Sequence, residues 1–261
     1  MGYIGMDISS NRIAVAEVTK KRNTFIIDNA AVFEVPEQVI EKGEIKDTRV
    51  VSSAIKDIWG YYRFGSRKVF VGLSNPKVII KEIKLPITDD REIESSIKYQ
   101  INDLVPISKN NITYDYFVVD KDDESSNIMI AGAAKNMVDS IVESLRNIRI
   151  NPVAIDLNCF SLYRVINTAY HFQSQKATDK KNAYCLVNIG KDISIINMLT
   201  GNQLKFPRFS NISIKTFIDY ISKKTNKSYG DIEKILDDFD FDQSLDMQFD
   251  RNLEPGMGGR Y

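Results

Sequence analysis

The chain has 261 residues, enough to bury a large core as one domain or as two compact ones. Its 35 basic and 35 acidic residues cancel, so a polyphosphate-binding surface is not expected as its main feature and we expect no nucleic-acid partner. Two cysteines and the single histidine, His171, leave little scope for a disulfide framework, a catalytic triad or a histidine-based zinc site.

The N-terminal part of the chain is expected to form an antiparallel meander followed by a helix and a further strand. Apolar or alternating segments are separated by short polar turns. A helix is expected over 48–62, where apolar residues recur at helical spacing and Trp59 falls on the apolar stripe, which favours a core position for its ring. The strands of this first unit are expected at 2–8, 12–20, 24–35 and 68–74.

A compact α+β module is expected next. Its first helix carries isoleucines at helical spacing on one face, and Thr88 is its expected N-cap because acidic residues follow in the first turn. The module is expected to contain strand 77–85, helix 89–104, strands 112–119 and 128–134, helix 136–148 and strand 152–155.

The third unit is expected to repeat the meander of the first. The polar segment 173–182 shows no apolar periodicity and is expected to be a loop, and the acidic, glycine-rich segment 240–261 an unpacked tail. The elements expected here are helix 157–172, strands 184–189, 193–199 and 203–209, and helices 213–225 and 229–239.

In both meanders a polar side chain stands near the end of the first strand, Asp7 in one and Asn188 in the other, before small or polar turn residues. Backbone N–H groups of such turns can hold phosphate oxygens, and a strand-end carboxylate can hold Mg²⁺. These residue types are also ordinary turn formers, so the pattern alone leaves both interpretations open. The candidate cofactor-binding residues are Asp7, Ser9, Ser10, Asn11, Asn188, Gly190 and Lys191, with Asp7 also the candidate metal ligand.

The stretch Gly5-Met6-Asp7-Ile8-Ser9-Ser10 is similar to the first phosphate hairpin of the actin-like ATPases related to FtsA. The ordered series that follows resembles the PilM family, the inner-membrane platform proteins of type IV pili, over about residues 1–230. The quoted segments include Lys68–Leu73, Val78–Pro86, Leu104–Pro106 and the second hairpin Val187–Phe209. The resemblance implies an α/β, actin-like (ribonuclease H-like) fold of two lobes, with an α+β insert and a truncated second lobe.

The resemblance also implies how the chain is divided and what it binds. It implies ATP with Mg²⁺ between the lobes, a PilN-like membrane protein whose N-terminal cytoplasmic peptide enters a groove between the first subdomain and the insert, and contact with the pilus motor ATPase. The implied parts are a first subdomain at 1–75 and 157–172, the insert at 76–156, a partial second-lobe subdomain at 183–239 and a tail at 240–261. The candidate peptide-binding residues are Leu85, Pro86, Ile97, Tyr99, Gln100, Leu104 and Val105.

The chain departs from the family pattern at the nucleotide site. Ser9 stands where the family has glycine, Ala14 where it has lysine and Asn188 where it has aspartate. Loss of one charge-assisted ligand removes about 1.5–3 kcal/mol, and the adenosine loop has no clear match. We therefore expect weak or absent ATP binding, no catalytic residues and a scaffold function. The alternative is an active actin-like ATP-binding protein or ATPase that a missing segment completes.

No stretch of the sequence approaches the ~18 apolar residues that span a bilayer. The expected location is therefore the cytoplasm, at the inner face of the cell membrane, with membrane association only through partners.

Overall fold

The fold is described from a computed structural model over residues 2–10, 12–22, 24–36, 38–106, 109–171, 183–200 and 203–238. The chain forms two compact units, Met1–Ser213 and Ile214–Tyr261, and each is described by itself. Three of the predictions, those for Asn11, for the loop 173–182 and for the tail 240–261, fall outside the described residues.

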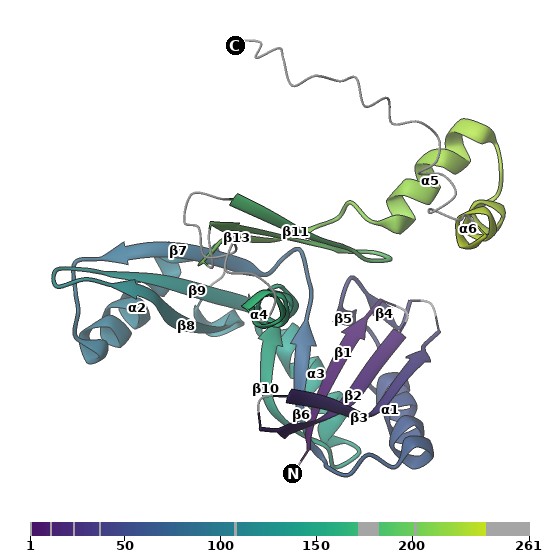
Figure 1. The fold of residues 1–261 in the computed structure, drawn as a ribbon, viewed down its shortest axis with the longest axis horizontal. Coiled ribbons are helices and arrows are strands. Elements are labelled where there is room, and N and C mark those ends of the chain that lie inside the picture. The colour runs from purple at the N-terminus through teal and green to yellow at the C-terminus, as the bar shows by residue number, and fades with distance from the viewer. Residues whose placement is uncertain are drawn as a thin grey trace. The chain divides into compact units, whose positions relative to one another are not determined.

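The first unit is built on a five-stranded sheet with the strand order β10-β6-β1-β2-β3 (Figure 1). Its strands are β1 (Tyr3–Ser9), β2 (Arg12–Lys21), β3 (Thr24–Glu34), β6 (Lys68–Leu73) and β10 (Asn151–Leu157). The first three form the predicted antiparallel meander, and β6 and β10 add to it in parallel. The short strands β4 (Ile40–Glu41) and β5 (Glu44–Ile45) pair separately.

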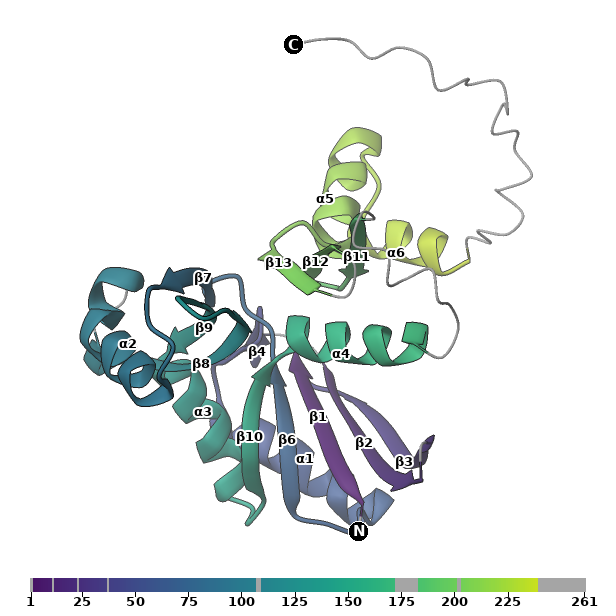
Figure 2. The same ribbon diagram turned by 60° about the vertical axis from the view of Figure 1, so that its left-hand side comes forward.

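Two helices, α1 (Thr48–Tyr62) and α3 (Lys135–Arg146), pack against each other and lie on one side of this sheet (Figure 2). The carboxylate of Asp47 begins α1 by accepting from the backbone N–H groups of Arg49 and Val50, and the apolar stripe of the helix is buried as predicted. Trp59 is one of the buried residues of α1, and its indole N–H donates to the carbonyl of Ser66. This packing forms the main core of the unit.

A buried hydroxyl links the two helices. Ser52 Oγ lies 2.8 Å from the carbonyl oxygen of Ser144 on α3 and 2.7 Å from that of Thr48 in its own helix. Replacing Ser52 with alanine should lower the free energy of unfolding by about 1–2 kcal/mol, because a buried acceptor loses its donor. Urea unfolding measures the change. Ser53→Ala, at an exposed position of the same helix, should stay within about 0.5 kcal/mol of the parent; equal effects would contradict the assignment.

The insert is a three-stranded antiparallel sheet, in the order β7-β9-β8, with a helix on it. Its elements are β7 (Ile79–Leu85), α2 (Asp90–Leu104), the 3-10 turn η1 (Lys109–Asn111), β8 (Ile112–Lys121) and β9 (Ser126–Ala134). The predicted N-cap Thr88 is wrong. The carboxylate of Asp89 accepts from the N–H groups of Arg91 and Glu92, so the helix begins one residue later, where a charged cap also suits the helix dipole.

Two elements that the sequence analysis assigned to the insert lie with the first sheet. β10 pairs in parallel with β6, and α3 packs against α1 and β10. The two edge strands β8 and β10 therefore belong to different sheets.

The helix α4 (Asn158–His171) lies between the first sheet and a second, antiparallel sheet of the same unit (Figure 2). The second sheet has the order β11-β12-β13 and confirms the predicted repeat of the meander. Its strands are β11 (Ala183–Ile189), β12 (Ser194–Thr200) and β13 (Gln203–Ser210). Asn197 Nδ2, buried on β12, donates to the carbonyl of Cys159 at 2.7 Å and so joins this sheet to α4.

The described part of the second unit consists of α5 (Ile214–Thr225) and α6 (Tyr229–Asp237), which pack against each other. Ser228 caps α6 through the N–H of Asp231. Among the described residues, no helix has the length and apolar character needed to cross a membrane.

Candidate functional site

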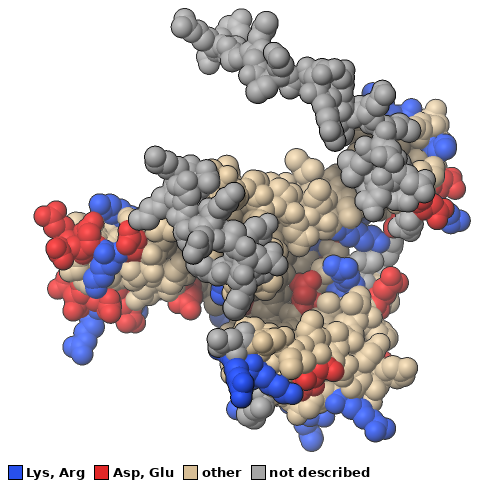
Figure 3. All heavy atoms as spheres, viewed as in Figure 1, with Lys and Arg blue, Asp and Glu red and all other residues tan. Residues whose placement is uncertain are grey.

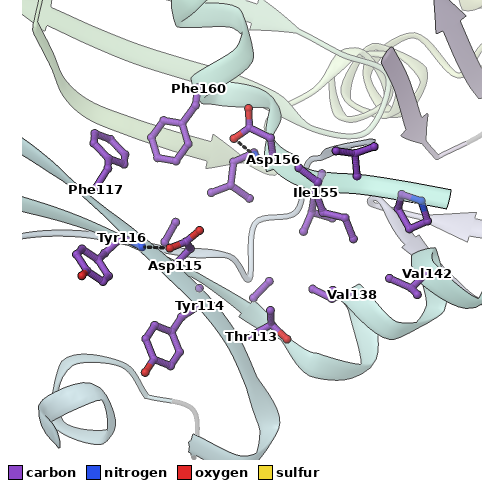
Figure 4. A pocket seen from close by; sticks show the side chains of 18 of the residues that line it. Thr113, Tyr114, Asp115, Tyr116, Phe117, Val138, Val142, Ile155, Asp156 and Phe160 are labelled. Atoms are coloured by element: carbon purple, nitrogen blue, oxygen red, sulfur yellow. Dashed lines mark hydrogen bonds between the residues drawn. The ribbon is translucent and has the colours of Figure 1, made fainter. Parts of the chain in front are cut away.

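A groove of about 520 Å³ opens between the insert and the first sheet (Figure 4). The two strands that flank it, β8 and β10, are both edges of their sheets. The remaining walls come from β9, α3 and the first turns of α4. Within the described ranges each edge strand has one side without a strand neighbour, so the groove can accept an extended chain that needs main-chain partners.

The edge strands β8 and β10 differ in how regularly their main chain could pair with an added strand. β10 contains Pro152, which has no N–H, and its register with β6 shifts between Pro152 and Ala154. In β8 the stretch Thr113–Phe117 pairs with β9 without interruption, and the register shift comes later, between Val118 and Asp120. The regular part of β8 is therefore the better template for a further strand.

Apolar side chains line the middle and one end of the groove. Val138 and Val142 come from α3, and Ile155 comes from β10 (Figure 4). At the end next to α4, Phe117 and Phe160 meet edge to face, with ring centroids 5.6 Å apart and an interplanar angle of 86°. A smaller pocket of about 320 Å³ shares these two rings on its wall. The two rings are thus placed to contact large apolar side chains of a ligand.

Charged groups at the groove are mostly held by neighbours. The carboxylate of Asp156 accepts from the N–H of Leu157, from Ser161 Oγ at 3.0 Å and from the guanidinium of Arg164. Asp115 Oδ1 accepts from the N–H of Tyr116 at 2.8 Å (Figure 4). Burial, helped by nearby acidic groups that include Asp115, raises the pKa of Tyr116, so this phenol stays neutral at physiological pH.

A second constellation lies where β1 and β6 end. Asp7 Oδ1 accepts from Asn158 Nδ2 at 2.7 Å, and the same amide nitrogen donates to Ser74 Oγ at 2.7 Å. Ser9 Oγ donates to the other Asp7 oxygen at 3.3 Å. A Cβ on Gly72 would lie 1.9 Å from Asn158 Oδ1, so the glycine leaves room for this amide. The carboxylate predicted to face a phosphate or a metal is thus engaged by a side chain of the same chain.

The first hairpin turn is fixed by a separate set of bonds. Ser10 Oγ accepts from the N–H of Lys42 at 3.0 Å, and the carbonyl of Lys42 accepts from Asn75 Nδ2 at 2.8 Å. Gly43 has φ +76°, and a Cβ there would lie 2.0 Å from the carbonyl oxygen of Ser74. The turn therefore keeps its shape through its own protein contacts.

The family model described as type IV pilus assembly protein PilM matches residues 5–248. The chain belongs to the PilM family. Among solved structures, the PilM-PilN type IV pilus biogenesis complex is similar at 20% identity with a TM-score of 0.75, over 90% of this chain and 69% of that one. The cytoplasmic domain of EpsL, an inner membrane component of the type II secretion system of Vibrio cholerae, is similar at 11% identity with a TM-score of 0.51, over 88% and 76%. A comparison with curated proteins gives no match. The expected actin-like α/β fold is confirmed.

The turn of the second predicted hairpin of this PilM-family chain is closed by a backbone hydrogen bond. Gly190 N–H donates to the carbonyl of Ile193 at 3.2 Å, and a Cβ on Gly190 would lie 2.4 Å from that oxygen. Asn188 and Lys191 are exposed, and Asn11 falls outside the described residues. In the described ranges, no group of three His, Cys, Asp or Glu residues is placed to hold a metal ion.

The residues predicted to bind a peptide lie on the insert but do not line the groove. Leu85, Ile97 and Val105 are buried in the core of the insert, and Leu104 packs on that core. Pro86 and Tyr99 are exposed, and Gln100 Nε2 donates to Ser96 Oγ. Sequence reasoning missed the lining residues of β8 and β10. Their alternation was visible, but nothing local shows that two strands of different sheets face each other.

Proposed function

We propose that this PilM-family chain is a platform component of type IV pilus assembly that holds an extended segment of a PilN-like membrane protein in the groove between β8 and β10. The observation that carries the proposal is the groove itself, with two edge strands on its sides and valines of α3 in its middle. Its volume of about 520 Å³ suits a short peptide segment rather than a folded domain.

The main chain of β8 and the apolar side chains that line the groove determine how a peptide would bind. An extended segment can form main-chain hydrogen bonds with the regular part of β8, and alternate side chains then point to the same wall. Those side chains would meet Val138 and Val142 in the middle of the groove and the rings of Phe117 and Phe160 at its end. Apolar contacts supply most of the affinity and the main-chain bonds fix the register.

The proposal includes the location and the second partner that the resemblance implies. A PilN-like protein anchored in the inner membrane would hold the chain at the cytoplasmic face of that membrane. The resemblance adds the pilus motor ATPase as a partner on the cytoplasmic side.

Isothermal titration of the chain with the N-terminal cytoplasmic peptide of the organism's PilN-like protein tests the proposal. We expect binding at micromolar peptide, and no heat at high micromolar peptide would overturn it. The variant Tyr99→Ala distinguishes peptide binding in the groove from peptide binding to the residues of α2 that the sequence analysis predicted. Tyr99 is 88% exposed, so the substitution should not disturb folding, and the groove proposal expects unchanged affinity. A tenfold loss would place the peptide on α2 instead.

We infer separately that the phosphate site does not retain a magnesium nucleotide. The residues do not fit the group, because Asp7 is already paired with Asn158 and Ser9, and Asn188 carries no charge. A metal would have to displace the amide of Asn158 from the Asp7 carboxylate.

Calorimetry with MgATP should therefore show no micromolar binding to the chain. The parent and the Asp7→Ala variant should both show no heat of MgATP binding, so a difference between them would reveal a site that depends on Asp7. Micromolar binding that disappears in Asp7→Ala would instead support the alternative, an active actin-like ATP-binding protein.

A further inference from the structure

Three connections of the first unit meet at one end of the five-stranded sheet. The strands β1, β6 and β10 run parallel, so the β2–β3 turn and the connections that lead into β6 and β10 all lie where these strands begin. The carbonyl of Arg67 accepts from the N–H of Asn151 at 2.7 Å, which joins two of the connections. A carboxylate oxygen of Glu17 on β2 accepts from the N–H of Gly65 at 3.2 Å. We call this surface the basic end, and it consists of residues 20–22, 63–68 and 146–149.

The basic end carries eight lysine and arginine side chains, and all of them are exposed. Within the described ranges none of the eight forms an ion pair, whereas Lys46, Lys121 and Lys135 elsewhere in the chain do. The acidic residues closest to this end along β2 and β3 are Glu17 and Asp28. Basic side chains are visible along the lower rim of the first sheet (Figure 3). The chain has no net charge, yet this end has a local excess of positive charge. The eight residues are Lys20, Lys21, Arg22, Arg63, Arg67, Lys68, Arg146 and Arg149.

Each of the three connections contains an arginine with a left-handed backbone. The angle φ is +54° at Arg22, +53° at Arg63 and +60° at Arg149. Glycine and asparagine adopt this conformation at a lower cost than a residue with a long side chain. Of the six described non-glycine residues with positive φ, three are these arginines. The fold thus accepts local strain at three chain reversals and has a cation at each of them, which indicates a role for the charge.

We propose that the basic end contacts the anionic surface of a phospholipid bilayer, with its lysine and arginine side chains among the lipid phosphate groups. The cations come from three separate connections, so they can reach several phosphates of a broad surface at once. Each lysine or arginine close to an anionic membrane raises the partition of a protein onto it about fivefold. Several exposed cations without ion-pair partners therefore suffice for reversible attachment.

An exposed aromatic ring stands beside the cations. Tyr61, in the last turn of α1 and two residues before Arg63, is 81% exposed, and tyrosine favours the headgroup region of a bilayer. The choice of a membrane as the source of the phosphate groups rests on the proposed function, in which a PilN-like protein holds the chain beside the inner membrane. A peptide in the groove and lipid at the basic end would then be two attachments to one membrane, and each would strengthen the other.

Co-sedimentation of the full chain with phosphatidylglycerol-containing vesicles tests the proposal, and phosphatidylcholine vesicles are the neutral comparison. We expect binding to the anionic vesicles alone, and weaker binding as the salt concentration rises. The triple variant Arg22→Asn, Arg63→Asn and Arg149→Asn should lose at least ~30-fold in vesicle affinity. Its free energy of unfolding should be no lower than that of the parent, because asparagine tolerates the left-handed conformation better. Lys20→Gln with Lys21→Gln, at positions without this strain, should lose at least ~10-fold.

A matched control removes three exposed cations from the insert. The variant Lys81→Gln, Lys84→Gln and Arg91→Gln changes the net charge by the same amount and should bind vesicles like the parent. Equal losses in the two triple variants, or a parent that does not bind anionic vesicles, would overturn the proposal. Binding of a DNA duplex in place of vesicles, followed by fluorescence anisotropy, would overturn it as well. The three substituted arginines do not line the groove, so titration of their variant with the PilN-like peptide tests the proposed function separately.

Discussion

Replacing Val142 with glutamate is expected to weaken binding of the PilN-like peptide at least ~30-fold, equivalent to about 2 kcal/mol. Val142 lies half-buried on α3 and lines the groove beside Val138 (Figure 4). A bound peptide would cover the new carboxylate and remove it from water without giving it a partner, which is costly for a charged group. The apolar contact of the valine would be lost at the same time.

Titration calorimetry with the same peptide measures this effect. Asn136→Glu is a matched control, because it adds the same charge to an exposed position in the first turn of α3 and does not line the groove. Negative charge is favourable at a helix N-terminus, so the control should fold and bind like the parent. Equal affinities for Val142→Glu and the parent would mean that the peptide binds elsewhere.

Replacing Gly43 with alanine is expected to lower the free energy of unfolding by about 2–4 kcal/mol. Gly43 has φ +76°, a conformation that strains an L-residue, and the new Cβ would lie 2.0 Å from the carbonyl oxygen of Ser74. The clashing atom is backbone, so a change of rotamer cannot relieve it. The strand end that carries Ser74 would have to move, and the bond from Asn158 Nδ2 to Ser74 Oγ with it.

Urea unfolding monitored by circular dichroism measures the loss. Gly60→Ala is the control, since Gly60 lies inside α1 and a Cβ there meets no atom within 4 Å. Alanine is the better helix former, so this variant should gain about 0.5–1 kcal/mol. Opposite signs for the two glycines are the expected result, and a neutral Gly43→Ala would show that the turn can rearrange.

Local sequence patterns predicted most elements of this fold. The helix 48–62 was predicted with the bounds it has, because a strong apolar stripe follows Asp47. In the structure Asp47 is the N-cap and Arg63, in the left-handed conformation, is the C-cap. The two meanders were predicted because polar turns separate alternating strands. The error at Thr88 was one residue, where two neighbouring side chains could each have capped the helix.

Contacts between distant residues could not be predicted in the same way. Nothing within 152–155 shows that this strand leaves the insert and pairs with β6, and without that pairing the groove has no second side. Asp7 was visible as a polar strand end, but Asn158, which pairs with it, stands 151 positions later. Asparagine at the start of a helix is a common capping residue, so its position alone did not indicate the contact with Asp7.

The successive residues Asn158 and Cys159 form hydrogen bonds to different sheets. The side chain of Asn158 donates to Asp7 in the first sheet, and the carbonyl of Cys159 accepts from Asn197 in the second sheet. Phe160, the next residue, lines the groove. A mechanical pull on a peptide seated against Phe160 would thus reach both sheets within one turn of α4. The helix α4 therefore links such a bound peptide to both sheets of the first unit.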